Sequence, residues 1–307
     1  MNSLNPVITA VSEGLSSRFD HDACRFFHGR GQTVEGLNYL NVDWFKPVLL
    51  VTLYNSVIET EWHDFVDELK QLGTGRIACC IVQHRSKRGA PIDILWGDLP
   101  DKTFAVERDL HFSLSFGEKQ NSGFFLDMAP GRRWLMERAD GLRVLNLFAY
   151  TCSFSVAAIK GGAKTVMNVD MSKAALNVGR DNHKMNNQEG KLKRDVQFLA
   201  YDIFRSWKNI IARGPYDIVV LDPPSRQKGS FMADKDYARV LRRIPSLMAE
   251  GGELLACLNA PELSEDFLTQ IIGRELPNAE FVERLQNRED FPEVDSQRNL
   301  KMLHYRI

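Results

Sequence analysis

From residue 143 to the C-terminus, segments rich in β-branched apolar residues alternate with segments of helical periodicity. This alternation predicts a mostly parallel, doubly wound α/β sheet with helices on both faces. Two expected strands close the chain with no clear helix between them, so we expect the final strand to be antiparallel. The expected strands are 143–148, 164–169, 195–200, 217–221, 253–258, 279–285 and 300–306, and the expected helices are 152–160, 173–185, 203–212, 235–249 and 264–274.

Three of the expected strands are followed by an aspartate. Asp170 ends KTVMNVD, Asp202 follows VQFLAY, and Asp222 ends YDIVVLD. Ligands of open α/β sheets bind beyond the carboxyl ends of the strands, so we expect one crevice edged by these carboxylates. Asp170 suits the two ribose hydroxyls of a nucleoside, whereas Asp202, with the backbone amides of Ile203 and Phe204, suits adenine. The alternative for any one strand-end aspartate is a helix N-cap or a turn residue.

The turn after the first strand of this region, within VLNLFAYTCSFSVAA, contains no glycine. A dinucleotide enzyme needs a glycine-rich turn so that the backbone can approach a pyrophosphate, which disfavours NAD and FAD. S-adenosylmethionine carries no phosphate, and hydrogen bonds from Asn146, Tyr150, Thr151 and Ser153 would suit its methionine part. Taken alone, this turn fits a plain strand–helix corner equally well.

The sequence Asp222-Pro-Pro-Ser follows an apolar expected strand. Proline fixes φ near −65°, so Pro223 and Pro224 make a rigid turn that projects the carboxylate and backbone carbonyls into the crevice. These oxygens can accept hydrogen bonds from an exocyclic amine or a ring N–H of a base and align that base with a methyl donor. The alternative is a Pro-Pro strand terminator without a function.

The N-terminal third has a different rhythm, with strands expected at 48–54 and 76–83 and an amphipathic helix at 59–72. We therefore expect two domains. Residues 1–105 would form an N-terminal extension and a small α+β domain with a possible RNA contact. Residues 106–307 would form the catalytic domain.

The charge balance is close to neutral, with 39 basic and 40 acidic residues and a net charge of −1. Any contact with a nucleic acid must therefore come from local patches. Arg226 and Lys228 are the best candidates for a substrate phosphate, because they adjoin the expected chemistry. The loop that holds Arg85, Lys87 and Arg88 is a second basic group, and a solvated surface is the alternative for both.

Cysteine and histidine patterns exclude several classes of protein. The five cysteines contain no Cys-x-x-Cys pair and the seven histidines no metal-spaced pair, so no metal site or disulfide framework is expected. The N-terminus has no leader pattern, and no run of 18 apolar residues occurs. The sequence therefore predicts a cytoplasmic protein without a membrane span.

Together, these residues resemble the RlmI/RlmK family of bacterial large-subunit ribosomal RNA methyltransferases. The resemblance runs from about residue 25 to the C-terminus, through GFFLDMAPGRR, VLNLFAYTCSFS, NVDMSKAAL, DNHKMN, YDIF and DPPS. It implies a Rossmann-like class I methyltransferase sheet, S-adenosylmethionine as cofactor, and RNA as partner, expected as 23S ribosomal RNA or a ribosomal precursor particle. The cofactor residues that it implies are Asp127, Arg132, Asn146, Phe148, Tyr150, Asp170, Ser172, Asp202 and Asp222. Thr151, Met171, Ile203 and Phe204 complete the expected cofactor set.

The chain departs from this family in three places. RlmI-like members carry an RNA-binding PUA domain before the central module, and this chain is too short at its N-terminus to hold one. Cys152 stands where glycine is usual, which narrows the approach to the methionine end of the cofactor. Asn259 stands where cytosine-C5 enzymes carry a nucleophilic cysteine, as in the RlmK type, which methylates a guanine ring nitrogen. Cys257 lies about 6–7 Å earlier on the same strand face and is expected to be a core thiol.

The sequence thus predicts an S-adenosylmethionine-dependent methyltransferase that acts on an RNA base, at a guanine ring nitrogen or at cytosine C5. Its expected catalytic residues are Asp222, Pro223, Pro224 and Asn259. One alternative is methylation of a protein side-chain amide or a small amine, because the Asp-Pro-Pro turn accepts any planar N–H. A second is a non-catalytic RNA-binding factor, which Cys152 favours.

Overall fold

The computed structural model of the chain describes residues 3–16, 22–117, 119–187, 190, 195–227 and 231–307. The chain packs as two compact units, Met1–Leu126 with Arg288–Val294, and Asp127–Asn287 with Asp295–Ile307. The first unit thus takes a short segment from late in the chain. The two domains predicted from the sequence stay a prediction, while the packing divides the chain after Leu126.

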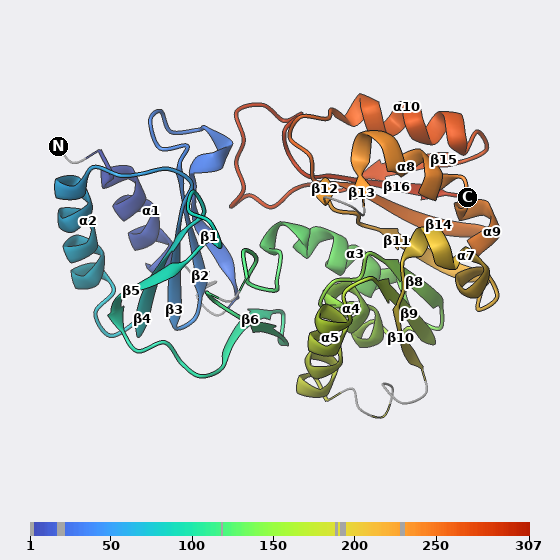
Figure 1. The fold of residues 1–307 in the computed structure, drawn as a ribbon, viewed down its shortest axis with the longest axis horizontal. Helices are drawn as coiled ribbons and strands as arrows, with labels where there is room; N and C mark the ends of the chain where they lie inside the picture. Colours follow the sequence, from blue (N-terminus) through green and yellow to red (C-terminus); the bar gives the residue numbers. More distant parts are fainter. Residues whose placement is uncertain (1–2, 17–21, 118, 188–189, 191–194, 228–230) are drawn as a thin grey trace. The chain divides into compact units, whose positions relative to one another are not determined.

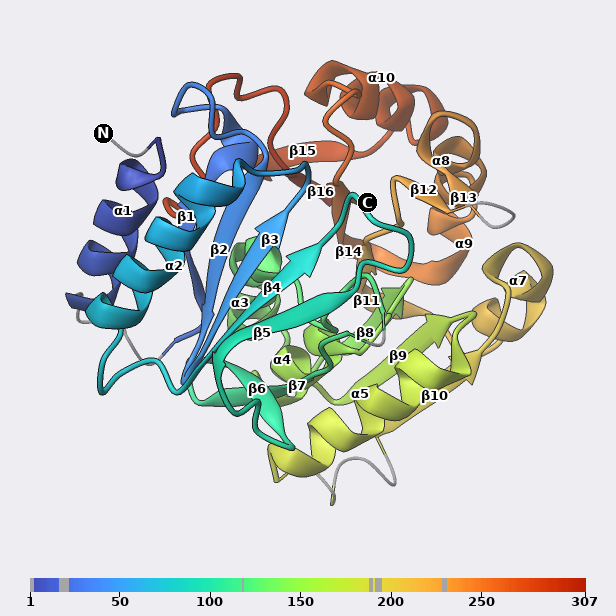
Figure 2. The same ribbon diagram turned by 60° about the vertical axis from the view of Figure 1, so that its left-hand side comes forward.

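The first unit is built on a sheet with the strand order β1-β2-β3-β4-β5 (Figure 2). β3 and β4 are parallel and are joined by α2, whereas the other neighbours are antiparallel. Apolar side chains of α1 and α2, among them Val7, Val11 and Phe65, form one core with the sheet. The elements are α1 (Asn5–Ser16), β1 (Cys24–His28), β2 (Leu40–Phe45), β3 (Val48–Leu53), α2 (Glu59–Leu72), β4 (Cys79–His84), β5 (Ile92–Gly97) and the hairpin of β6 (Thr103–Glu107) and β7 (Leu110–Leu114).

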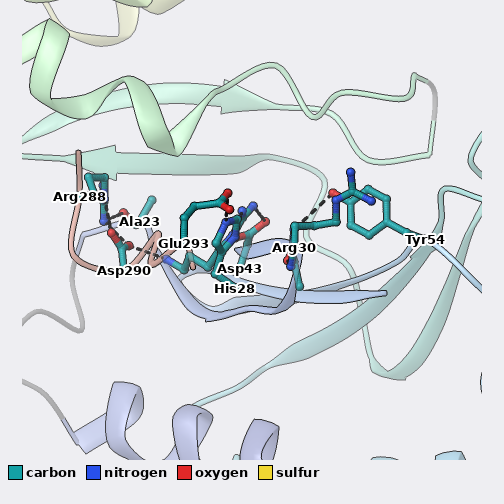
Figure 3. Close-up of polar contacts among 10 residues, drawn as sticks. Ala23, His28, Arg30, Asp43, Tyr54, Arg288, Asp290 and Glu293 are labelled. Atoms are coloured by element: carbon teal, nitrogen blue, oxygen red, sulfur yellow. Dashed lines mark hydrogen bonds and ion pairs between the residues drawn. The ribbon is translucent and has the colours of Figure 1, made fainter. Parts of the chain in front are cut away.

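The late segment Arg288–Val294 joins the first unit beside β1 (Figure 3). The Arg25 backbone N–H donates to Asp290 Oδ2 at 2.9 Å, and His28 Nε2 lies 3.4 Å from Glu293 Oε1. Burial, together with the charge of Arg25, lowers the pKa of His28 to about 3, so its ring is neutral at physiological pH. His28 therefore has structural partners in this unit.

The second unit contains the doubly wound sheet, in the order β10-β9-β8-β11-β14-β16-β15 (Figure 1). Neighbours from β10 to β14 are parallel, and β16 is antiparallel to both β14 and β15. The predicted fold class is confirmed, including the antiparallel final strand. The strands are β8 (Arg143–Leu147), β9 (Thr165–Asp170), β10 (Val196–Ala200), β11 (Tyr216–Leu221), β14 (Met248–Leu258), β15 (Glu280–Arg284) and β16 (Lys301–Arg306).

Helices cover the two faces of this sheet with separate cores. One core contains Trp134 of α3 and Phe154 of α4, and the other contains Ile203 of α7, Tyr237 of α8 and Leu268 of α10. The central strands β8, β9 and β11 are buried from both sides, which explains the continuous apolar runs in their sequences. The helices are α3 (Ala129–Arg138), α4 (Ser153–Lys160), α5 (Lys173–Met185), α7 (Ile203–Ile211), α8 (Ala233–Leu241), α9 (Ile244–Leu247) and α10 (Glu265–Glu275).

The single helix predicted over 235–249 is wrong. The structure has two helices there, α8 and α9, and β14 already begins at Met248. Pro245 lies in the first turn of α9, where its missing N–H cannot continue the hydrogen bonds of α8. The apolar pattern runs through both helices, so periodicity alone could not locate the break.

The strand register aligns the carboxyl ends of the central strands. Leu147 at the end of β8 pairs with Val169 of β9 and with Leu221 of β11, and Asp170 pairs with Ala200 of β10. The three predicted acids follow β9, β10 and β11 and therefore lie along one edge of the sheet.

Candidate active site

The turn between β8 and α4 has an alternating left-handed backbone. Phe148, Tyr150 and Cys152 have φ values of 59°, 47° and 62°. Side chains rarely adopt this conformation, so surrounding contacts must hold the turn. The Cys152 N–H donates to the Ala149 carbonyl at 2.8 Å, and the Ala149 N–H donates to the Val169 carbonyl at 3.0 Å. The backbone of this turn is thereby fixed against β9 without a glycine.

Cys152 fits into this turn because α5 leaves room for it. An added Cβ on Gly179 would lie only 2.5 Å from Cys152 Sγ, so the thiol fills the space that Gly179 leaves. The side chain is fully buried, and burial raises the pKa of its thiol well above the usual range. Cys152 is therefore a packing residue, directed toward α5.

Asp170 ends β9 and accepts two backbone hydrogen bonds. Its Oδ2 accepts from the Tyr150 N–H at 2.8 Å, and its Oδ1 accepts from the Ser172 N–H at 2.7 Å. Ser172 caps α5 by accepting from the Ala175 N–H at 3.1 Å, and Met171 between them is 53% exposed. The carboxylate is thus held between the left-handed turn and the start of α5.

Asp202 is the N-cap of α7, as the alternative interpretation of the strand-end acids predicted. Its Oδ1 accepts from the Phe204 N–H at 2.9 Å, and its Oδ2 lies 3.3 Å from the exposed Arg205 guanidinium. The Phe204 amide, expected beside adenine, donates to this cap. The Ile203 side chain is buried in the core.

Asp222 follows β11 and is partly buried, with Pro223 buried next to it. Burial and the nearby negative charge of Asp127 raise its pKa to about 7, and the positive charge of Arg132 opposes this shift. Arg132 lies on α3 and is only 1% exposed. Asp222 is therefore a carboxyl group that changes charge close to neutral pH.

Asp127 and Asn259 meet at the same edge. Asn259 is exposed just beyond β14, and its Nδ2 donates to Asp127 Oδ2 at 3.3 Å. Asp127 lies in a short 3₁₀ helix, Leu126–Met128, directly before α3. The sequence placed Asp127 in the cofactor set and Asn259 beside the base, and the structure joins the two.

A family model described as S-adenosylmethionine-dependent methyltransferase matches residues 24–306 of the chain. The chain belongs to this methyltransferase family. The cofactor of this methyltransferase is S-adenosylmethionine, as predicted. Ribosomal RNA large subunit methyltransferase I of Aeromonas hydrophila is 27% identical over 278 residues, covering 84% of this chain and 68% of that protein. Ribosomal RNA large subunit methyltransferase K/L of Shewanella loihica is 36% identical over 166 residues, covering 52% of this chain and 23% of that protein. The resemblance to RlmI/RlmK enzymes is confirmed.

Solved structures share the fold of this methyltransferase. A protein from Streptococcus mutans described as a SAM-dependent methyltransferase superposes with a TM-score of 0.87 at 24% identity, covering 100% of this chain and 82% of that one. The tRNA m1G37 methyltransferase of Methanocaldococcus jannaschii superposes with a TM-score of 0.62 at 14% identity, covering 98% of this chain and 78% of that one.

Three aromatic rings of the methyltransferase pack beside the Asp-Pro-Pro loop. The Phe231 ring lies 5.1 Å from that of Phe148 and 6.3 Å from that of Phe204, measured between centroids. Phe231 is 1% exposed, and it anchors this loop together with Phe148 and Phe204.

Asn146 lies inside β8 and is 1% exposed, although the sequence placed it against the methionine part of the cofactor. Its Nδ2 donates to Asn168 Oδ1 at 3.0 Å, and Asn168 Nδ2 donates to Ser155 Oγ at 2.9 Å. Ser155 Oγ lies 2.9 Å from His183 Nε2. Sequence reasoning missed this buried polar network.

Thr151, which the sequence placed in the cofactor set, is also buried, and its backbone carbonyl accepts a hydrogen bond from Asn182 Nδ2 at 3.0 Å.

Cys257 is fully buried in the methyltransferase core, as predicted. Burial raises the pKa of its thiol well above the usual range. Its backbone carbonyl accepts a hydrogen bond from Tyr237 Oη at 2.9 Å. The sequence gave no signal for Tyr237 beyond its helical spacing, because the contact joins α8 to β14.

The basic side chains near the Asp-Pro-Pro loop and on or directly after α8 divide between exposed and paired ones. Arg226 is exposed on β12 (Arg226–Gln227), which pairs with β13 (Phe231–Met232), while Lys228 lies outside the described residues. Arg239 Nη1 lies 2.5 Å from Asp236, and Arg242 Nε lies 2.7 Å from Glu275. Over the described residues, no cluster of three His, Cys, Asp or Glu side chains is placed to hold a metal. Within the same residues, no helix combines the length and apolar character that a membrane span requires.

Proposed function

We propose that this methyltransferase transfers a methyl group from S-adenosylmethionine to a guanine ring nitrogen in RNA, with large-subunit ribosomal RNA as the substrate class. The named relatives act on that RNA. The single observation that carries the proposal is Asp222, a partly buried acid with a pKa of about 7 beside the Asn259–Asp127 pair.

The residues at the ends of β8 and β9 fit S-adenosylmethionine. A carboxylate offers about four acceptor positions, and Asp170 uses one on each oxygen for Tyr150 and Ser172, which leaves acceptors for two ribose hydroxyls. The exposed Met171 side chain suits the apolar face of the nucleoside, and Asp202 at the next strand end suits the adenine amino group. The bound cofactor supplies a methyl group made electrophilic by its sulfonium.

The residues at the ends of β11 and β14 would bind the acceptor base. Ionised Asp222 accepts a hydrogen bond from an N–H of the base, and the rigid Pro223 and Pro224 direct the nearby carbonyl groups to the same planar edge. Asn259 Nδ2, held by Asp127, offers a donor beside that acceptor. Arg226, exposed on β12, would contact a phosphate next to the target nucleotide.

The buried Cys257 favours a ring nitrogen over cytosine C5. Attack on cytosine C6 requires a thiolate, whereas burial raises the pKa of this thiol and keeps it protonated. A guanine ring nitrogen is already nucleophilic and needs only alignment and a hydrogen-bond acceptor. Cys152, which favoured a non-catalytic factor, packs in the space beside Gly179 and gives that alternative no support.

Radiolabelled methyl transfer tests the proposal. The protein is incubated with labelled S-adenosylmethionine and an extract from cells that lack its gene, and the products are divided by ribonuclease and protease treatment. We expect label that ribonuclease releases, and mass spectrometry of the nucleosides identifies a methylguanosine. Label found in protein alone would exclude an RNA acceptor, and labelled 5-methylcytidine would exclude the ring nitrogen.

A further inference from the structure

Two arginine side chains of the first unit lie close to the ring of one tyrosine, Tyr54. Tyr54 directly follows β3 and Arg85 directly follows β4, and these two strands are parallel neighbours with Leu53 paired to His84. The Arg85 guanidinium carbon lies 5.8 Å from the centroid of the Tyr54 ring, and that of Arg30 lies 4.7 Å from it. Arg30 comes from the 3₁₀ helix Gly29–Gly31, and Figure 3 shows its side chain along the Tyr54 ring.

The buried side-chain amide of Asn41 holds Tyr54 and the Arg30 backbone in place. Asn41 is 1% exposed, its Nδ2 donates to Tyr54 Oη at 3.3 Å, and its Oδ1 accepts from the Arg30 N–H at 3.3 Å. Arg85 Nη1 donates to the Gln120 carbonyl at 3.0 Å. The Tyr54 hydroxyl, the Arg30 backbone and the Arg85 guanidinium are therefore held by hydrogen bonds before any ligand binds, which lowers the entropic cost of binding.

Within the part of the chain that the structure describes, no acidic side chain pairs with Arg30 or Arg85. Among the described residues, the recorded partners of the Arg30 and Arg85 side chains are uncharged, whereas Arg25 in the same unit pairs with Asp43 at 2.6 Å. Lys87 and Arg88 are exposed in the turn that follows Arg85. The nearby Asp93 pairs with His84 at 2.8 Å.

We propose that Tyr54, Arg30 and Arg85 form a platform for single-stranded RNA in the first unit. Unpaired bases stack on aromatic rings and on guanidinium planes, and unneutralised cations attract the phosphates beside them. An unpaired base would stack on the Tyr54 ring or on the Arg30 guanidinium beside it, with the adjacent phosphates at Lys87 and Arg88. The platform rests on the proposed function, because it would bind the RNA whose base is methylated at the second unit. An acidic peptide would need the cations but not the aromatic ring.

Fluorescence anisotropy of the full chain with a short labelled single-stranded oligoribonucleotide tests the platform. Tyr54→Leu is expected to weaken RNA binding by roughly 5- to 100-fold through the loss of one stacked base. Arg30→Ala and Arg85→Ala are each expected to weaken binding and to reduce the salt dependence by about 0.7 in the slope of log affinity against log salt. Arg30→Lys keeps the positive charge but removes the planar guanidinium. This variant should therefore keep the wild-type slope of log affinity against log salt and bind RNA with a lower affinity. Lys70→Ala, which removes an exposed lysine of α2, is the control and should bind RNA like the wild type.

Two further measurements separate the platform from the proposed function. Calorimetric titration with S-adenosylmethionine should give the wild-type affinity in every variant, since the proposed cofactor residues belong to the second unit. If the wild type methylates RNA and the Tyr54 and Arg30 variants bind RNA with wild-type affinity, the platform is wrong and the proposed function stands. If a polyglutamate peptide binds in an Arg30-dependent way and the wild type labels protein alone, both proposals are wrong.

Discussion

Asp170 at the end of β9 and Asp222 directly after β11 both lie at the carboxyl edge of the sheet, yet their surroundings differ. The Asp170 carboxylate accepts backbone N–H groups of Tyr150 and Ser172 at 2.8 Å and 2.7 Å. Asp222 is partly buried, and its pKa is raised to about 7 by burial and by the nearby charge of Asp127. We call the first region, with the turn 148–152, the holding half of the edge. The second region, with Asp127 and Asn259, is the reacting half.

This difference shows how one edge of a sheet can carry cofactor binding at one place and the reaction at another. Backbone amides fix the orientation of a carboxylate, which suits a group that must hold a ribose in one place. A second carboxylate nearby penalises the ionised form, which suits a group whose charge must respond to a proton at neutral pH. On the proposed function, the holding half positions the cofactor and the reacting half engages the base. Substitutions in the two halves should therefore affect different quantities, cofactor affinity in the holding half and turnover in the reacting half.

The largest effect is expected from Asp222→Asn in the reacting half. The amide cannot ionise or accept a proton, so kcat for RNA methylation should fall by roughly 10²- to 10⁴-fold. Single-turnover transfer of labelled methyl groups measures this. Asp234→Asn, an exposed acid in the first turn of α8, is the matched control and should keep the wild-type rate. A rate within tenfold of the wild type for Asp222→Asn would remove this residue from the chemistry.

The next effect is expected from Asp170→Ala in the holding half. A charge-assisted hydrogen bond to the ribose contributes about 1.5–3 kcal/mol, so the loss of even one should raise the Kd for S-adenosylmethionine by roughly 10- to 100-fold. Calorimetric titration measures the Kd. Asp181→Ala removes an exposed acid of α5 that pairs with Lys184 at 2.8 Å, and it should leave the Kd unchanged. Equal losses in the two variants would mean that the Asp170 carboxylate does not hold the cofactor.

The pH profile of the reacting half sharpens the comparison further. At a pH below its pKa of about 7, Asp222 is protonated and is a weaker, uncharged acceptor for a base N–H, whereas at higher pH the carboxylate is ionised and accepts strongly. At saturating cofactor, kcat/KM for RNA should therefore rise with pH by about tenfold between roughly pH 6 and pH 8. Asp127→Asn removes a charge that raises the pKa of Asp222, so the midpoint should move to lower pH. A flat profile, or a midpoint that rises in Asp127→Asn, would contradict this coupling.

The sheet and its acidic edge could be predicted because both follow from local pattern. Alternating strands and helices give a parallel sheet, and parallel strands place their carboxyl ends together, so Asp170 and Asp222 were expected at one edge. The bounds of α2 and α5 also follow from periodicity, since apolar residues at helical spacing need no distant partner. The break at Pro245 in the helix predicted over 235–249 was missed. The apolar periodicity continues across this proline, whereas the helical hydrogen bonds do not, because proline has no N–H.

The packing within the site could not be predicted, because it joins residues far apart in the sequence. Cys152 fits because Gly179 of another helix lacks a side chain, and the pKa of Asp222 depends on Asp127, which precedes α3. Asn146 was expected at the cofactor because it is a polar residue near the end of the expected strand 143–148 and because the family resemblance implies it. Nothing in the sequence indicated that its side chain joins the buried network of Asn168. Sequence pattern sets which edge carries the site, and long-range contacts set what each residue does there.

The smallest effect is expected from Cys257→Ala, which tests whether the reacting half works without a covalent step. The thiol is fully buried with a raised pKa, and the carbonyl that accepts from Tyr237 belongs to the backbone and is kept. We expect kcat within about threefold of the wild type and a loss of stability of about 1 kcal/mol, measured by urea unfolding. No RNA–protein adduct should survive denaturing electrophoresis during turnover. A different result would change the acceptor: a folded Cys257→Ala variant without turnover, together with an adduct in the wild type, would mean that the methyl group goes to a cytosine carbon. Asp222 would then accept a hydrogen bond from the bound cytosine.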